Sequence, residues 1–210
     1  MGKLINYLKR DFTKDRKLIL FLWLILLMGL IFGAFFITIL DEHDKLTVSN
    51  YITNFFGQIK NNKLDYEMAL RNCLTSNLIY ILIIWLLGIS IIGIPVIILL
   101  VFCKGYIIGF SIAAIIANYK FIGLLGAFTY IFPHIIIMSI VIILISCYAL
   151  SISTNLLRAL IKRREINFKN IINRYCLVML FGIIITVIVS IIEVYISPYL
   201  IKIFLFFIKL

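Results

Sequence analysis

An uninterrupted apolar run, Leu18–Leu40, constrains this chain more than any other feature of its sequence. The run contains no charged side chain, and a helix needs about 20 apolar residues to cross the hydrocarbon core of a bilayer. In the whole chain of 210 residues, 64% are hydrophobic and only 14% are charged. In an average soluble domain about 45–50% of the residues are apolar and about 25% are charged. We therefore predict an all-α integral membrane protein, a polytopic bundle of about five transmembrane helices.

Apolar runs and polar breaks divide the chain into five spans and the segments between them. The spans are predicted over 18–40, 74–92, 95–118, 135–156 and 175–196. The other segments are a cytoplasmic amphipathic helix over 1–17, an extracytoplasmic loop over 41–72 with room for one helix, a re-entrant or interfacial half-helix over 121–132, a cytoplasmic loop over 158–174 and an interfacial tail over 199–210. The break between the second and third spans has two solutions. A cut at Gly93–Pro95 gives better lengths, and a cut at Lys104–Gly105 brings Lys104 to the cytoplasm.

Charge distribution orients these spans. Twelve of the 20 basic residues lie in 1–17 and 158–174, whereas 41–72 is rich in acidic residues. The positive-inside rule places the two basic segments in the cytoplasm and 41–72 outside. The net charge of +11 then indicates contact with anionic membrane lipid rather than with nucleic acid.

Residues that could carry chemistry are few. His43 and His134 are the only histidines, and the four cysteines are scattered through apolar stretches without metal-site spacing. We therefore predict no enzymatic activity, no metal and no cofactor. Lys104 and Glu193 are charges inside predicted spans, where ionisable residues often mark functional sites. They could pair or line a polar path, or they could reach the interface.

Small residues indicate where helices approach closely. Gly105 and Gly109 are spaced to let two helix backbones come together, either within one chain or at the seam of a homodimer. Gly123 and Gly126 have the same potential in the half-helix. We expect Gly88, Gly93 and Pro95 to shape the packing around the central break.

An ordered set of short motifs carries a family resemblance. The motifs are Asn77, Ile83–Gly88, Gly93–Pro95, Lys104–Phe110 and Phe132–Ile136. With them the chain resembles the stage II sporulation protein M family. Wider relatives follow the Pro-His pair with a glycine and a Glu-Leu-Pro-Ala stretch, and Ile135–Ile140 lacks both the acid and the second proline.

The resemblance implies a bacterial plasma-membrane protein needed for engulfment of the forespore. It implies a non-catalytic scaffold that recruits and localises two peptidoglycan-degrading partners, the stage II sporulation D and P proteins. Exposed aromatic residues often anchor partners. We expect docking at Tyr51, Phe55, Phe56 and the Phe121–His134 segment, which includes Phe121, Pro133 and His134, although Phe55 and Phe56 could instead sit among lipid headgroups.

A permease or channel subunit is the competing hypothesis. It rests on the Gly- and Pro-broken central helices, a recurring feature of transporter sites, and on Lys104 and Glu193. A transport path would normally collect more polar groups at mid-membrane than these two.

Overall fold

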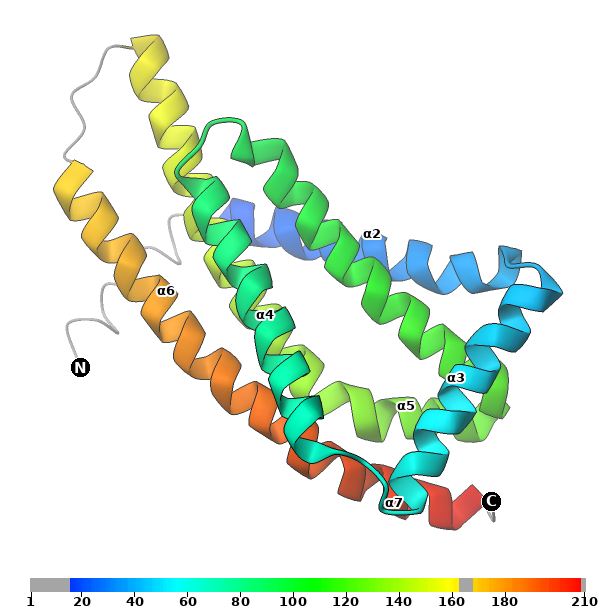
Figure 1. Ribbon diagram of the computed structural model, residues 1–210. Coiled ribbons are helices and arrows are strands. Elements are labelled where there is room, and N and C mark those ends of the chain that lie inside the picture. The colour runs from blue at the N-terminus through cyan, green and yellow to red at the C-terminus, as the bar shows by residue number, and fades with distance from the viewer. Residues whose placement is uncertain (1–15, 163–167, 209–210) are drawn as a thin grey trace.

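A computed structural model shows that the described part of the chain is helical (Figure 1). The structure describes residues 16–162 and 168–208, with side chains outside 121–133, 162–171 and 203–208. The elements are α2 (Arg16–Ile39), α3 (Glu42–Lys60), α4 (Tyr66–Gly88), α5 (Gly93–Lys162), α6 (Phe168–Ile191), the π-helical turn η1 (Ile192–Ile196) and α7 (Ser197–Ile208). The amphipathic helix predicted over 1–17 lies outside the described residues, except that Arg16 and Lys17 begin α2.

Five stretches are long and apolar enough to cross a membrane, which confirms the predicted class. They are Arg16–Ile39, Tyr66–Gly88, Gly93–Lys120, His134–Ile161 and Ile172–Lys202. In the most apolar part of His134–Ile161, 56% of the residues are buried, whereas the other four stretches reach only 17–33%. This helix is therefore the centre of the bundle, and the others present much of their apolar surface outward.

The segment predicted as a loop over 41–72 is instead mostly helical. It contains α3, a short turn and the first turns of α4. Asp65 caps α4, because its side chain accepts a hydrogen bond of 3.1 Å from the Met68 backbone N–H. This cap satisfies one of the free N–H groups of the first turn, so α4 begins well before the predicted start at residue 74.

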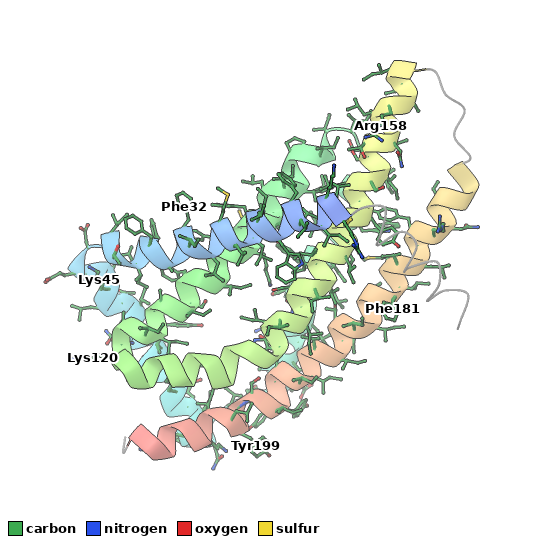
Figure 2. All side chains as sticks on the ribbon, turned by 180° about the vertical axis from the view of Figure 1, so that it is seen from behind. Phe32, Lys45, Lys120, Arg158, Phe181 and Tyr199 are labelled. Carbon is green, nitrogen blue, oxygen red and sulfur yellow. The ribbon has the colours of Figure 1, made fainter. Side chains whose placement is uncertain are left out.

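Helix α5 has its sharpest change of direction at Lys120. That residue has φ 53° and ψ −134° inside an otherwise helical stretch. Beyond it the backbone of 121–133, the crossing segment, runs across one end of the bundle before the helix turns toward Arg158 (Figure 2). The half-helix predicted over 121–132 is thus continuous with the following span, because the helix accommodates Pro133. Such proline is tolerated in membrane helices whose freed backbone groups find other partners.

The central break and the last span also differ in detail from the prediction. Two positions were considered for the central break. The structure has the break at the first of them, with a turn before Gly93, and the helix is unbroken through Lys104. At the other end, Ser197 and Pro198 do not stop the last helix. The turn η1 leads directly into α7, and Ser197, the residue before Pro198, keeps helical backbone angles. The tail predicted from residue 199 is therefore part of a longer helix.

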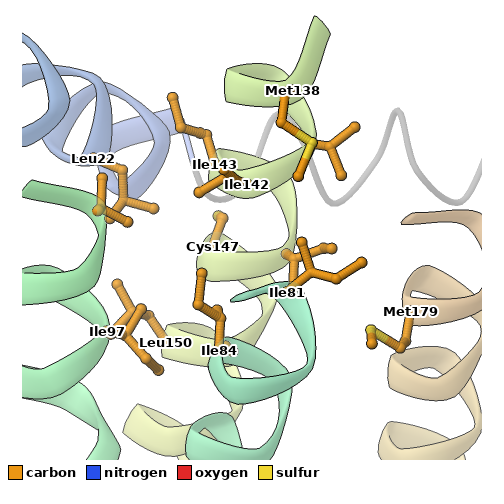
Figure 3. Packing of buried hydrophobic residues seen from close by; sticks show 14 of the residues in the cluster. Leu22, Ile81, Ile84, Ile97, Met138, Ile142, Ile143, Cys147, Leu150 and Met179 are labelled. Atoms are coloured by element: carbon orange, nitrogen blue, oxygen red, sulfur yellow. The ribbon is translucent and has the colours of Figure 1, made fainter. Parts of the chain in front are cut away.

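Two apolar clusters hold these helices together. The larger one is centred on the second half of α5 and includes Ile142, Cys147 and Leu150, packed against Ile81 and Ile84 of α4 (Figure 3). The smaller one joins α3, α5 and α7 through the buried residues Phe56, Ile59, Ile115 and Ile201. We call α3, the crossing segment and α7 the end layer, because they gather at one end of the molecule (Figure 1).

Glycines bring α2 and the first half of α5 into the closest backbone contact. A Cβ atom at Gly105 or Gly109 would collide with the backbone carbonyl oxygen of Leu26 or Leu30 in α2. The relation is reciprocal, since a Cβ at Gly29 or Gly33 would collide with the carbonyls of Phe102 and Tyr106. The seam that Gly105 and Gly109 could have formed in a homodimer is thus occupied within one chain.

Candidate functional site: a buried polar cluster beneath the end layer

A cluster of polar side chains lies between α4, α5 and the α6–η1 helix. Its members, called the polar cluster, are Cys73, Asn77, His134, Ser190 and Glu193. The Cys73 thiol donates to Glu193 Oε2 at 3.1 Å, and His134 Nε2 lies 3.9 Å from Glu193 Oε1. Asn77 Nδ2 donates to both Ser190 Oγ and Cys73 Sγ at 3.4 Å. Three separate spans therefore meet at one carboxyl group.

Helix geometry explains why these residues converge. Cys73 and Asn77 are four residues apart on α4, and Ser190 and Glu193 are three apart, so each pair shares one helix face. Glu193 lies in η1, and single π-helical turns inside α-helices are frequent at functional sites. His134 follows the crossing segment, and its side chain is only 8% exposed, whereas that of Glu193 is 30% exposed. The carboxyl group is thus reachable from one side.

Lys104 lies near the polar cluster without joining it directly. Its ammonium nitrogen is 5.2 Å from the centroid of the Tyr80 ring, which favours a cation. The Tyr80 hydroxyl donates to the backbone carbonyl of Leu100. Within the described residues, Lys104 and Glu193 form no direct ion pair.

The cluster's chemistry is that of proton exchange and hydrogen bonding. A thiol, an imidazole and a carboxyl group in contact can accept and donate protons. Among the residues that the structure describes, no group of three or more His, Cys, Asp or Glu side chains has an arrangement that could hold a metal ion.

The end layer separates the predicted docking residues into different environments. Tyr51 is 76% exposed on α3 and Phe55 is half-buried. Phe56 is only 5% exposed and stacks on Tyr119 with ring centroids 5.5 Å apart. Phe56 therefore anchors α3 to the protein, and the prediction that it is an exposed docking residue is not supported by its position.

The Phe121–His134 segment is likewise not a uniform surface. His134 is buried in the polar cluster. Phe121 and Pro133 belong to the crossing segment, and their side chains, like those of Gly123 and Gly126, lie outside those described.

The glycines at the central break lie against backbone and side chains. A Cβ at Gly88 would collide with the Tyr175 hydroxyl and with Ala149, and one at Gly93 would collide with the backbone of Leu87. Pro95 lies in the first turn of α5, where a proline fits a helix. These residues shape the turn and its contact with the centre of the bundle.

Sequence reasoning missed part of this arrangement. Cys73 was not singled out among the four scattered cysteines and Ser190 was not considered, although their helical spacing to Asn77 and Glu193 was a usable signal. Gly29 and Gly33 were also overlooked, although they repeat the four-residue spacing of Gly105 and Gly109.

Comparison with known proteins gives a family match. Residues 21–198 match the family model described as Stage II sporulation protein M. No curated protein and no solved structure matches the chain significantly.

Proposed function

The chain belongs to the Stage II sporulation protein M family, and from this premise we propose that it is a non-catalytic membrane scaffold. It recruits and localises peptidoglycan-degrading enzymes at the septal and engulfing membrane during endospore formation. Family membership makes it a sporulation membrane protein, and the five apolar helices agree with a multi-pass protein. The recruiting role goes beyond family membership and is the part that needs testing.

The proposal rests on how α3 packs against the rest of the protein. Phe56 and Ile59 hold one face of the helix against the smaller apolar cluster. On the other side Thr47, Tyr51, Asn54 and Gln58 are exposed at helical spacing, and we call them the α3 outer face. Tyrosine and asparagine are characteristic of surfaces that bind proteins, because they combine contact area with adaptable hydrogen bonds. A rigidly held helix with such a face suits docking.

The partners proposed for this face are the stage II sporulation D and P proteins. Wall-degrading enzymes act outside the plasma membrane, so the proposal requires the end layer to face outward. The acidic character of 41–72 and the basic character of 1–17 and 158–174 support that orientation.

Capture of the two partners tests the proposal. The tagged full-length chain is co-expressed with the D and P proteins, crosslinked and purified in detergent. Loss of a hot-spot aromatic typically costs 2 kcal/mol or more, so we expect Tyr51→Ala to reduce the recovered partners by about tenfold or more.

Tyr199→Ala is the matched control, because Tyr199 is a 64% exposed tyrosine on α7 of the same end layer. We expect it to capture partners like the unchanged chain, with equal amounts of both variants in the membrane. If the unchanged chain captures neither hydrolase, the scaffold proposal fails. If Tyr51→Ala captures them normally, the α3 outer face is not the docking site.

The polar cluster supports a second candidate function, a permease or channel subunit. Ionisable groups shared between spans mark many ion and proton pathways, and Glu193 is partly accessible. The chain in liposomes carrying a pH-sensitive dye would then raise proton flux above that of protein-free liposomes. Glu193→Gln should abolish the increase, whereas Glu67→Gln, an exposed carboxylate at the start of α4, should not. Flux no greater than that of protein-free liposomes would contradict this candidate for protons.

A further inference from the structure

A groove lies where the first span ends and α3 begins, away from the polar cluster. Its volume is about 380 Å³, within the range of roughly 300–1,000 Å³ typical of small-molecule sites. Ile37 of α2 and Ala114 of α5 are buried in its wall. Figure 2 shows Lys45 on α3 close to the end of α2. The groove is thus built by three helices that the rest of the fold holds in place.

The polar residues of the groove fall into two groups. Ser49 and Asn118 satisfy each other, because the Ser49 hydroxyl donates to Asn118 Oδ1 at 2.6 Å and Asn118 Nδ2 donates to the Ser49 carbonyl at 3.4 Å. They form part of the groove wall and join α3 to α5. Glu42 and Lys45 differ from them. Lys45 has a single long contact of 3.4 Å to the Thr38 carbonyl, and Glu42 has no hydrogen bond or ion pair in the described part of the chain.

Glu42 and Lys45 therefore offer one negative and one positive charge to a ligand. They are three residues apart in the first turn of α3, so they lie on neighbouring positions of one helix face. An ammonium group has three hydrogen-bond donors and a carboxylate only acceptors. A ligand that satisfies both must carry an anionic group and a cationic N–H donor a short distance apart.

The place of the groove indicates the rest of the ligand. Ile37 belongs to the last turn and a half of the first candidate span, and the polar helix α3 begins at Glu42. The groove therefore opens at the level where hydrocarbon gives way to lipid headgroups. Its apolar wall, which includes Val48 and Ala117, suits the start of acyl chains.

We propose that this groove binds the headgroup of a zwitterionic aminophospholipid, with the phosphate on Lys45 and the primary ammonium on Glu42. Phosphatidylethanolamine has both groups on a two-carbon bridge. An anionic headgroup such as phosphatidylglycerol would place a phosphate near Glu42 with no cation to offset it. Phosphatidylcholine has the right charges, but its quaternary nitrogen cannot donate a hydrogen bond to the carboxylate.

Lipid retention by the purified full-length chain tests the proposal independently of any partner protein. The chain is titrated with phosphatidylethanolamine, phosphatidylglycerol and phosphatidylcholine of identical acyl chains, and bound lipids are counted by native mass spectrometry. We expect phosphatidylethanolamine to be retained about tenfold more tightly than the other two, the scale of one charge-assisted hydrogen bond. Equal retention of the three lipids would overturn the proposal.

Variants locate the lipid on the protein. Glu42→Gln and Lys45→Gln should each remove the preference, whereas Glu67→Gln and Lys63→Gln, exposed residues at the same end of the molecule, should preserve it. Ala117→Trp adds bulk at the exposed edge of the groove and should reduce retention without changing any charge. A preference that persists in Glu42→Gln and Lys45→Gln, or retention unchanged by Ala117→Trp, would contradict the assignment.

Discussion

Tyr175 shows how one side chain can complete a helix that belongs to another part of the chain. It is 2% exposed, and its hydroxyl donates to the Trp85 carbonyl at 2.7 Å. Trp85 lies in the last turn of α4, where carbonyl groups lack partners within the helix. The two rings also stack, with centroids 5.4 Å apart. Tyr175 therefore caps α4 from α6.

Removing this hydroxyl should destabilise the protein measurably. We expect Tyr175→Phe to lower the free energy of unfolding in detergent by about 1 kcal/mol, because the Trp85 carbonyl loses its donor in a partly buried site. Tyr195→Phe is the control, since Tyr195 is 44% exposed and stacks on Tyr66, while its hydroxyl has no hydrogen bond among the described residues. Equal stability of the two variants would show that the hydroxyl contributes nothing.

At the scale of elements, α2 and the first half of α5 depend on the absence of side chains. The glycines of each helix face backbone carbonyl oxygens of the other, an arrangement that also allows Cα–H···O contacts. A backbone atom cannot rotate away as a side chain can. Added bulk must therefore separate the two helices along their length.

Gly105→Ala should accordingly be costly for so small a change. We expect it to lower the free energy of unfolding by about 1–3 kcal/mol, as for overpacking of a tight core. Gly57→Ala provides the control, because nothing lies within 4 Å of a Cβ there, and the gain in helix propensity should stabilise α3 by about 0.5–1 kcal/mol. Thermal unfolding followed by circular dichroism would compare them, and a Gly105→Ala protein as stable as the unchanged chain would refute the packing argument.

The same elements show how far sequence could predict this structure. Apolar length alone predicted five spans, because the bilayer sets that length physically. The spacing of Gly105 and Gly109 predicted a close approach but not its partner, since any small-residue face would fit. A break near Lys120 was predicted, because the third span was expected to end at 118 and the half-helix to begin at 121. The positive φ of Lys120 was not predicted, because that conformation is typical of glycine. The two residues before Lys120, Asn118 and Tyr119, contact Ser49 and Phe56 of α3.

Proline and aromatic residues were the least predictable in the site. Pro133 and Pro198 lie between segments that were predicted to be separate, yet the helix is continuous through both. Proline is tolerated inside membrane helices where the freed backbone groups find other partners. Phe55 and Phe56 look equivalent in sequence, and only the packing of α3 on Tyr119 and Ile201 separates the anchor from the partly exposed residue. The sequence alone could not show that Cys73, His134 and Glu193 converge, because they lie on three different helical elements.

For the molecule as a whole, the two ends differ in construction. One end consists of the short turn before α5, the last turns of α5 and the first turns of α6, whereas the other is covered by the end layer (Figure 1). Basic residues dominate the loop segments predicted at the first end, and the acidic segment 41–72 lies at the second. The charge rule predicts that the end layer faces outward.

Cysteine accessibility would establish this orientation. We expect Lys63→Cys, in the turn after α3, to react with a membrane-impermeant maleimide in intact cells. Ser90→Cys, in the turn before α5, should react only after the membrane is permeabilised, and the unchanged chain with its four cysteines sets the background. If Ser90→Cys reacts in intact cells and Lys63→Cys reacts only after permeabilisation, the end layer faces the cytoplasm. The scaffold proposal then fails.

The glycine contact between α2 and α5 also sets an order of events during synthesis. Gly29 and Gly33 enter the membrane well before Gly105 and Gly109 exist, because about 70 residues separate the two pairs. At roughly 5–20 residues per second, the partner helix arrives about 4–14 s later. During that interval the glycine face of α2 is open to lipid, to the insertion machinery or to another nascent copy. During this delay α2 can pair wrongly, because the helix that covers its glycine face has not yet been made.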